Sequence, residues 1–307
     1  MIKFRFHFTL SLFTILGLLL AACTPAPASS AISLPDGMAR VITLHGPAQR
    51  IVSLAPSNTE LLFEVGAGAQ VVGRDDFSDF PAEAKKLTSI GGSDGNYDLA
   101  AIAALKPDLV LAAGINTPEQ VKALENLGLT VFYLNNPDHL VGIFQNMLSV
   151  GILTGKTDQA EALVQSLTAR VNTMIDTLPT ITTHYKVYYE LDATDPNNPY
   201  TAGPGSYINQ ILEYAGDQNI GATLSSPFAK ISSAEVIRQN PDFILLGDTA
   251  YGVTVDSVMQ RPGWSAINAV KNGHVFVFDD NTVSRPTARI FDAMEVLGKI
   301  LHPDVYK

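Results

Sequence analysis

The chain has few residues with which to build a metal centre or a disulfide framework. Its 307 residues include one cysteine and six histidines. A single cysteine cannot form a disulfide within the chain, and the histidines are widely scattered, so a zinc or manganese site is not expected. Basic residues are also scarce: 20 lysines and arginines face 30 aspartates and glutamates, for a formal net charge of -10. This charge disfavours nucleic acid and anionic lipid as partners.

Long hydrophobic runs are absent except at the N-terminus. Two basic residues precede an apolar run over residues 6–20, which is short for a membrane span and typical of a signal peptide. Two alanines then precede Cys23, a pattern that a lipoprotein signal peptidase cleaves. We therefore predict a lipoprotein signal peptide over residues 1–22 and an extracytoplasmic protein that touches the membrane only through a lipidated Cys23. A plain secretory signal with an incidental cysteine is the alternative.

The next residues are expected to be flexible. Residues 23–33 are rich in proline, alanine and serine, which predicts a tether. Order is expected to begin at Arg50, where an apolar run through Pro56 reads as a β-strand and Ser57 to Glu60 reads as a capped helix start. A strand followed by a helix is the unit of a parallel sheet.

A short pattern occurs twice, 134 residues apart. A helix that begins at Leu99 ends before Pro107 and Asp108, and a buried strand follows. The second copy runs from Ala234 through Pro241 and Asp242 into another apolar strand. Each copy precedes one further strand. The repeat predicts two similar α/β lobes.

Between the copies lies a segment with regular helical spacing. Eight apolar residues recur on one face over residues 157–178, Asp158 and Glu161 supply a capping pair, and a proline follows. We predict a helix that connects an N-terminal lobe, residues 34–156, to a C-terminal lobe, residues 179–307. An ordinary surface helix of one domain is the alternative.

Five segments carry a resemblance to a known family: Arg50–Glu60, Ala104–Leu111, Thr201–Tyr207 with Gln210–Gly216, Arg261–Trp264 and Val283–Pro286. In this order they resemble the substrate-binding proteins of ABC importers for cobalamin and ferric chelates, most closely the cobalamin-type members. The resemblance implies the class III periplasmic binding protein fold: two α/β lobes, each a mainly parallel sheet flanked by helices, joined by one long helix. It also implies a monomer that holds a ligand between the lobes and delivers it to a permease dimer with its ATPase.

The resemblance also implies that one glutamate of each lobe docks onto arginines of the permease. Glu60 and Glu235 occupy those motif positions. Carboxylates on separate lobes can set orientation through bidentate contacts with arginine. A local role is the alternative, because Ser57 to Glu60 and Ser232 to Glu235 both fit a capping box.

Aromatic and polar residues are expected to line the ligand site. The resemblance places aromatic contacts at Phe77, Tyr200 and Phe228, although core packing is the alternative for each. Residues near strand ends supply the other candidates, since such loops form ligand sites in α/β proteins. These candidates are Pro56, Ser57, Asp94, Tyr97, Asp280, Asn281 and Arg285, and Arg285 has a structural salt bridge as its alternative role.

The sequence departs from the best-known cobalamin binders at the aromatic positions. Asp94 and Phe228 stand where such proteins carry tryptophan. The expected ligand is therefore cobalamin, with a ferric siderophore or haem as the alternative, and no cofactor is expected. An extracytoplasmic hydrolase is a remote alternative, because Ser57 lacks the flanking glycines of a nucleophile elbow. A tethered adhesion or scaffold protein would have no ligand between its lobes.

Overall fold

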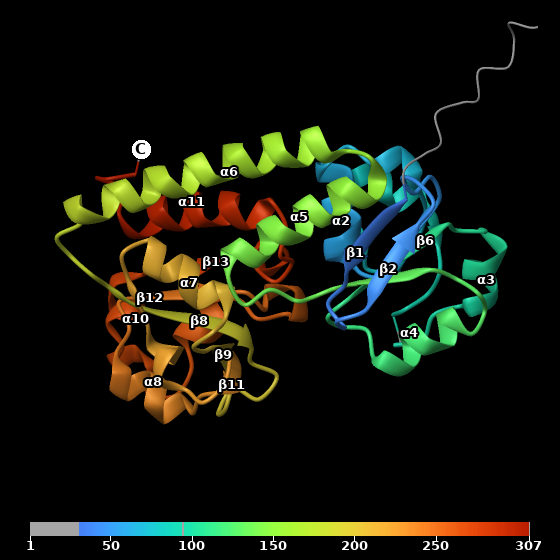
Figure 1. Cartoon of the computed structure of the whole chain (residues 1–307). Helices are drawn as coiled ribbons and strands as arrows, with labels where there is room; N and C mark the ends of the chain where they lie inside the picture. The colour runs from blue at the N-terminus through green and yellow to red at the C-terminus, as the bar shows by residue number, and fades with distance from the viewer. Residues whose placement is uncertain (1–30, 94, 307) are drawn as a thin grey trace, which may run out of the picture.

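The computed structural model describes residues 31–93 and 95–306, which form two α/β lobes beneath one long helix (Figure 1). The N-lobe is built on a parallel five-stranded sheet in the order β5-β4-β3-β6-β7. Its strands are β3 (Ile51–Ser53), β4 (Val71–Arg74), β5 (Thr88–Ser89), β6 (Leu109–Ala113) and β7 (Val131–Leu134).

The C-lobe is built on a mixed six-stranded sheet in the order β11-β9-β8-β12-β13, with β10 also paired to β8. Strands β8, β10, β12 and β13 run parallel, whereas β9 and β11 join as antiparallel strands at one side. The bounds are β8 (Lys186–Asp192), β9 (Tyr200–Ala202), β10 (Gln218–Asn219), β11 (Phe228–Lys230), β12 (Phe243–Leu246) and β13 (Val275–Val277). The predicted fold of two lobes with mainly parallel sheets is confirmed.

Helices cover both faces of each sheet. They are α2 (Pro56–Glu64), α3 (Leu99–Ala104), α4 (Pro118–Glu125), α5 (Leu140–Thr154), α6 (Thr157–Thr177), α7 (Tyr207–Tyr214), α8 (Ser233–Gln239), α9 (Val255–Met259), α10 (Asn268–Asn272) and α11 (Arg289–Leu301). The outer face of each sheet has its own apolar cluster, with α3 and α4 in the N-lobe and α8 and α9 in the C-lobe. A third cluster is continuous across the inner faces of both sheets through α2, α5, α6, α7 and α11. The lobes therefore share one core.

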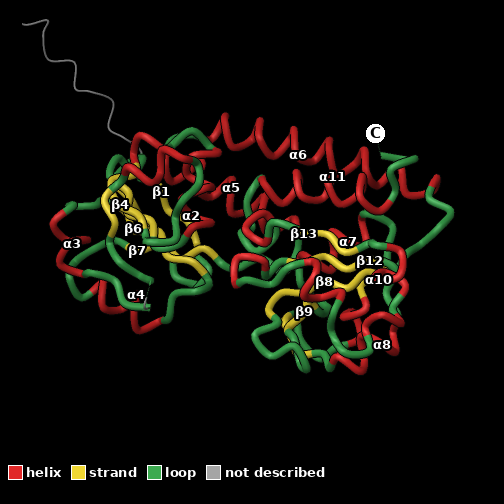
Figure 2. The backbone as a smooth tube through the Cα atoms, turned by 180° about the vertical axis from the view of Figure 1, so that it is seen from behind, coloured by secondary structure: helices red, strands yellow, loops and turns green. Residues whose placement is uncertain are grey.

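Helix α6 runs from the N-lobe across the C-lobe, side by side with α11 (Figures 1 and 2). Its 21 residues span about 32 Å at 1.5 Å per residue. Arg170 of α6 donates to Asp292 and Glu295 of α11, both at 2.6 Å. The predicted capping pair at the start of α6 is wrong, because Lys156 is the N-cap and no side chain caps the helix.

The two copies of the sequence repeat have the same local structure. Lys106 and Asn240, which precede the prolines, both have a positive φ, of 49° and 51°, so each helix ends in a left-handed residue. Asp108 accepts a hydrogen bond of 2.9 Å from the backbone N–H just before β3, and Asp242 accepts one of 3.0 Å from the first residue of β8. The aspartate thus ties the end of the helix to the neighbouring strand in both lobes.

Order begins earlier than the sequence indicates. Strands β1 (Ile32–Pro35) and β2 (Val41–Leu44) form an antiparallel hairpin before Arg50. Asp36 stabilises the turn, since it accepts hydrogen bonds from the backbone N–H groups of Met38 and Arg40, each at 3.0 Å. The expectation of a flexible tether is therefore wrong for the last two residues of 23–33. The predicted signal peptide and Cys23 lie outside the described residues.

None of the helices within residues 31–93 and 95–306 combines the length and apolar character needed to cross a bilayer. The same residues contain no group of three or more histidine, cysteine, aspartate and glutamate side chains that could hold a metal ion.

Candidate functional site

A cavity of about 320 Å³ lies where loops of the two lobes meet. Residues 136–138, which follow β7 at the carboxyl end of the N-lobe sheet, form one wall. Residues 205–207 and 226–228 of the C-lobe form the other. Loops that follow the strands of α/β sheets are the usual place for ligands. The lobes are held at this point by the backbone N–H of Leu140, which donates to Oε1 of Gln210 at 2.8 Å.

Phe228 and Tyr200 form an exposed aromatic pair at the edge of the C-lobe sheet. In the antiparallel register of β9 and β11, Tyr200 lies opposite Lys230 and Phe228 lies opposite Ala202. Residues opposite one another share a face, so the two rings lie diagonally on the same face, within reach of one another. Each side chain is 40% exposed, and the Lys230 ammonium lies 5.3 Å from the centre of the Tyr200 ring. Neither aromatic is a core residue.

Phe77 is presented by a well-ordered loop of the N-lobe. Buried Asp75 accepts a hydrogen bond of 3.0 Å from the backbone N–H of Phe77 and another from the hydroxyl of Ser78. Burial raises the pKa of Asp75 above its ordinary value, although these hydrogen bonds oppose the shift. The loop leaves Phe77 55% exposed. Phe77 is thus available to a ligand rather than packed in the core.

The hydroxyl of Tyr97 is hydrogen-bonded within the N-lobe. Its hydroxyl donates to the carbonyl of Leu54 at 2.8 Å and accepts from the side-chain amide of Asn116 at 2.7 Å. Burial raises the pKa of Tyr97, so the hydroxyl remains protonated at neutral pH. The ring could contact a ligand, but the hydroxyl already has partners. Asp94 lies outside the described residues.

Helix α2 begins at Pro56, two residues earlier than a cap at Ser57 requires. Ala55 is the N-cap, with extended φ and ψ of −153° and 148°, and no side chain caps the helix. Proline suits the first helical position because its fixed φ is helical and its missing N–H would be unpaired there. The predicted capping role of Ser57 is therefore wrong. Pro56 and Ser57 lie half-buried in the first turn, at the carboxyl end of β3.

The C-lobe candidates Asp280 and Asn281 lie in the loop after β13. Tyr189 donates to Oδ1 of Asp280 at 2.6 Å, and burial raises the pKa of Asp280. Asp280 therefore holds the loop to the sheet. Asn281 is exposed, and its backbone N–H donates to Asp279 at 3.1 Å, which leaves its side chain at the surface.

Arg285 and Glu60 join the two lobes. Nη1 of Arg285 donates to Oε1 of Glu60 at 2.9 Å and to Oδ1 of Asp79 at 2.6 Å. Arg289 donates to the same Glu60 oxygen at 3.1 Å, and the Thr287 hydroxyl donates to the other at 3.0 Å. The Glu60 side chain is 0% exposed. Both Glu60 oxygens are therefore bound by the C-lobe, so the structure includes the salt bridge that was the alternative for Arg285.

Glu64 extends this junction by one helical turn. The backbone N–H of Ala288 donates to both of its carboxylate oxygens, at 3.0 and 3.1 Å, at the start of α11. Burial, assisted by the nearby charge of Glu60, raises the pKa of Glu64 to about 7 against these hydrogen bonds. A carboxylate of the N-lobe thus caps a helix of the C-lobe.

Several residues of this junction were not predicted from the sequence. They are Glu64, Asp79, Phe80, Thr287 and Arg289, and the Arg289 guanidinium lies 4.3 Å from the centre of the Phe80 ring. Arg289 is the first residue of α11 and Arg285 precedes that helix, so no helical spacing in the sequence connected the two arginines.

The two predicted docking glutamates have different surroundings. The capping-box alternative for Glu60 is wrong, since its side chain contacts the other lobe. Glu235 lies in the first turn of α8 with a side chain 33% exposed. Ser232 caps the helix through the backbone N–H of Glu235 at 3.1 Å. The Glu235 carboxylate instead accepts from Arg238 at 2.5 and 2.7 Å, and these bonds lower its pKa.

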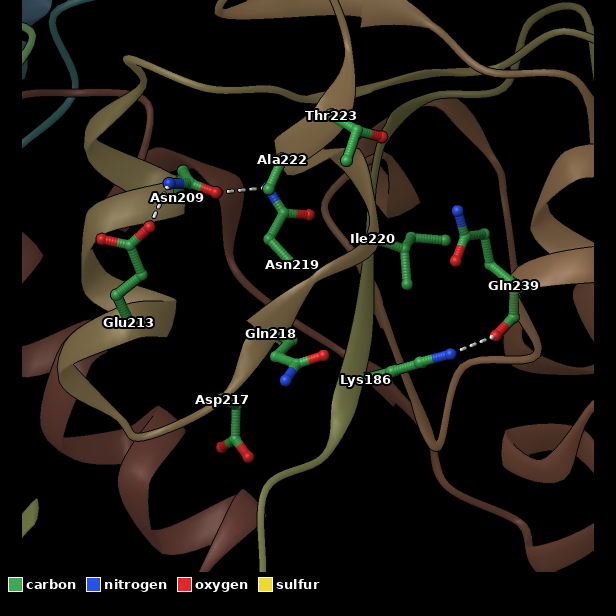
Figure 3. A pocket seen from close by; sticks show the side chains of 10 residues that line it. All are labelled: Lys186, Asn209, Glu213, Asp217, Gln218, Asn219, Ile220, Ala222, Thr223 and Gln239. Carbon is green, nitrogen blue, oxygen red and sulfur yellow. Dashed lines mark hydrogen bonds between the residues drawn. The ribbon is translucent and has the colours of Figure 1, made fainter. Parts of the chain in front are cut away.

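A second cavity of about 320 Å³ lies on the C-lobe by α7 and β10 (Figure 3). Its polar side chains bond to one another. Asn219 donates to Asn209 at 3.0 Å, Asn209 donates to Glu213 at 2.8 Å, and Lys186 donates to the Gln239 carbonyl at 3.4 Å. It lies at the start of β8, away from the carboxyl ends of the strands, and we assign it a structural role.

The model of the periplasmic binding protein family matches residues 51–282. This range includes both sheets, from the first strand of the N-lobe sheet to the loop after β13. The chain belongs to the periplasmic binding protein family. Such proteins are extracytoplasmic solute receptors of ABC importers rather than enzymes, which excludes the hydrolase alternative.

Relatives within the periplasmic binding protein family have different named ligands. The chain is 28% identical over 279 residues to a Bacillus subtilis protein named as an uncharacterized ABC transporter substrate-binding lipoprotein, covering 90% of this chain and 87% of that one. It is 29% identical to a cobalamin-binding protein of Halobacterium salinarum, covering 88% and 74%. A haem-binding protein of Roseiflexus is similar in structure, with a TM-score of 0.74, 25% identity and coverage of 85% and 100%.

Proposed function

We propose that this receptor captures a corrinoid of the cobalamin type between its lobes and delivers it to an ABC permease. The observation that carries the proposal is the exposed aromatic face of Tyr200 and Phe228, beside a cavity that loops of both lobes line. Phe77 adds a third exposed ring on the N-lobe. Large, partly planar ligands are bound by apolar and aromatic walls with a few fixed polar groups.

The polar groups of the proposed site are fewer than the sequence indicates. The Tyr97 hydroxyl, Asp280 and Arg285 already have protein partners. A ligand that relies on strong ion pairs with the protein would have to break these contacts. A corrinoid can instead be held mainly by ring contacts and by backbone groups, which favours it. The name of the Halobacterium salinarum relative supports the same choice.

Haem or a ferric siderophore is the second candidate. The Roseiflexus structure supports haem, because that protein is named as haem-binding. Arg285 and Arg289 at the junction would suit the carboxylates of haem or of an iron chelate if the contacts with Glu60 opened.

Calorimetric titration tests the proposal. The protein used for the titration should begin at residue 24, because β1 starts at Ile32. A start at residue 34, the predicted bound of the N-terminal lobe, would remove half of this strand. Cyanocobalamin, a hydroxamate ferric siderophore and haem are titrated in parallel. We expect one-to-one binding of cyanocobalamin that is tighter than that of the other two ligands. Binding of an iron chelate alone would keep the receptor role and reject the corrinoid.

We extend the proposal to the membrane and the permease. Cys23 carries the lipid anchor, and Glu235 and Glu60 contact the two halves of the permease dimer. Glu235 is accessible for this role, whereas Glu60 would first have to leave its partners in the C-lobe. Mass spectrometry of the N-terminal peptide from membranes tests the anchor, and an unmodified Cys23 there would reject it.

A further inference from the structure

The C-lobe has a cavity of about 440 Å³ that the proposed function does not use. It lies at the carboxyl ends of β8 and β12, which run parallel and side by side. From β8 the chain continues to β9 on one side, and from β12 to β13 on the other. The cavity is therefore at the topological switch point of the sheet, where open α/β sheets bind ligands.

One carboxylate oxygen of Asp248, in the wall of this cavity, has no hydrogen-bond donor among the described residues. The residue is 0% exposed, and its Oδ2 accepts from the backbone N–H of Ala193 at 2.9 Å. Its Oδ1 is buried and receives no hydrogen bond from any described residue. Burial, followed by the nearby charge of Glu190, raises the pKa of Asp248 to about 6. A buried acceptor without a donor is costly, so a group that supplies the hydrogen bond is favoured here.

The surrounding charges favour a cation. Arg261 donates to both oxygens of Glu190, at 2.5 and 2.7 Å, so its positive charge is already paired. Asp192 also lines the cavity, and hydrogen bonds from the hydroxyl and backbone N–H of Thr194 lower its pKa. Three carboxylates, those of Glu190, Asp192 and Asp248, lie around this cavity. Against them stand the charge of Arg261 and that of Lys230 near Asp192, so the net charge is −1 when Asp248 is ionised.

An aromatic side chain stands at the same cavity. Tyr251 is 81% exposed, at the end of a short turn that starts after Asp248. The face of such a ring attracts an ammonium group. Val253 supplies an adjoining apolar surface.

We propose that this cavity binds a cationic amine, with the ammonium on Asp248 and the carbon chain against Tyr251. The ammonium reaches Oδ1 through one ordered water or after a small shift of the turn over residues 249–251. The amine is either a free molecule or an arm of the ligand between the lobes, since Asp192 lies opposite Tyr200 in the β8–β9 register.

Calorimetry with 1,4-diaminobutane tests the site, with 1,4-butanediol as the neutral probe of similar shape. We expect the diamine to bind, the diol not to bind, and Asp248→Asn to weaken diamine binding at least about tenfold. Asp256→Asn is the matched control, because Asp256 is exposed on α9 and does not line the cavity. It should leave binding nearly unchanged. No binding to the native protein, or equal binding to Asp248→Asn, would overturn the proposal.

Two further measurements keep the test independent of folding. Tyr251→Ala changes an exposed residue and should lower the affinity for the diamine several-fold. Tyr251→Phe keeps the ring and should leave this affinity unchanged. Binding should also weaken as the pH falls from 7.5 to 5, because Asp248 becomes protonated. The titratable and charged groups that interact with Asp248 are Glu190, Arg261, Tyr188 and Tyr189, and Asp192 lines the same cavity. The loss of binding at low pH should be absent from Asp248→Asn. The same pH dependence in that variant would contradict the assignment to Asp248.

The source of the amine is found by repeating the titration with cyanocobalamin, the ligand probe of the proposed function, bound between the lobes. Displacement of the diamine would assign the cavity to an arm of that ligand, and undisturbed binding would assign it to a free amine. Both results support the site. The diamine titration of the free protein needs no corrinoid, so failure of this site and failure of the proposed function are distinguishable.

Discussion

Glu60 shows how a single side chain can join two lobes. It accepts hydrogen bonds from Arg285, Arg289 and Thr287, all more than 220 residues away. Its side chain is fully buried, whereas the two arginines keep partial exposure and second partners in Asp79 and Asp279. Removing one partner of a buried pair leaves the other charge unpaired, which costs more than the pair itself contributes. Glu60 therefore cannot be replaced without an effect on the junction.

Glu64 should make stability depend on pH. Its pKa is about 7 in the folded protein, against an ordinary value of 4.5, so the folded state holds more protons between these values. Stability should then decrease as the pH rises through this range, by up to about 3 kcal/mol from this group. Glu64→Gln should flatten the profile. Urea unfolding at pH 5, 6, 7 and 8 measures it, and parallel profiles for the variant and native protein would reject this assignment.

The aromatic pair should contribute to affinity rather than to folding. Tyr200→Ala and Phe228→Ala each remove a ring that is 40% exposed, so the loss of core packing is small. We expect each change to lower the affinity for the corrinoid about tenfold or more, while the unfolding midpoint changes little. Leu127→Ala is the control, because Leu127 is 51% exposed after α4 and away from the cavity. Affinities unchanged from the native protein would show that the rings do not contact the ligand.

At the scale of elements, the repeated aspartate should stabilise each lobe separately. Asp108 accepts from the backbone N–H groups of Gln49 and Arg50, at 2.8 and 2.9 Å. Asp108→Ala leaves these donors without a protein partner and should cost about 1–3 kcal/mol of stability. Ligand affinity should not change. Asp242→Ala should lower the stability of the C-lobe by a similar amount. Unfolding in guanidinium chloride measures the change in the free energy of unfolding, and a variant as stable as the native protein would show that solvent replaces the carboxylate.

Local patterns predicted the elements well, because helix and strand periodicities depend on near neighbours. The repeat ends in a left-handed residue and an aspartate in both lobes, and the connecting helix ends within one residue of its predicted bound. The hairpin over Ile32–Leu44 was missed, since its four-residue strands alternate only weakly. The partners of Glu60 were missed for a different reason. A contact over 220 residues leaves no spacing signal, and the local Ser57–Glu60 pattern pointed to a cap instead.

At the scale of the molecule, docking should depend on Glu235 without affecting ligand capture. Among the described residues, the Glu235 carboxylate is hydrogen-bonded to Arg238 and Gln239 of its own helix, so Glu235→Ala should preserve the fold. We expect unchanged corrinoid affinity and strongly reduced uptake by vesicles that contain the permease and its ATPase. Glu213→Ala changes another exposed C-lobe glutamate and serves as the control. Normal uptake, or lost affinity, with Glu235→Ala would contradict the docking role.

The junction between the lobes is built to resist bending. The core is continuous across the inner faces, and Phe144 of α5 stacks on Phe291 of α11 with ring centres 5.2 Å apart. Opening the lobes widely would expose this apolar surface, at about 25 cal/mol for each Å². It would also separate Glu60 from two arginines. Both costs oppose a hinge between the lobes.

We therefore expect the lobes to move by only a few degrees on binding, rather than to close widely. Small-angle X-ray scattering of the free and corrinoid-bound protein measures the change, and the two profiles should nearly superimpose. Glu60→Ala removes the central ion pairs but leaves the shared apolar core, so the free variant should be only slightly more extended than the native protein. If the variant expands strongly, the ion pairs rather than the core hold the lobes. A strong compaction of the native protein on binding would mean that neither the ion pairs nor the shared core prevents the lobes from closing.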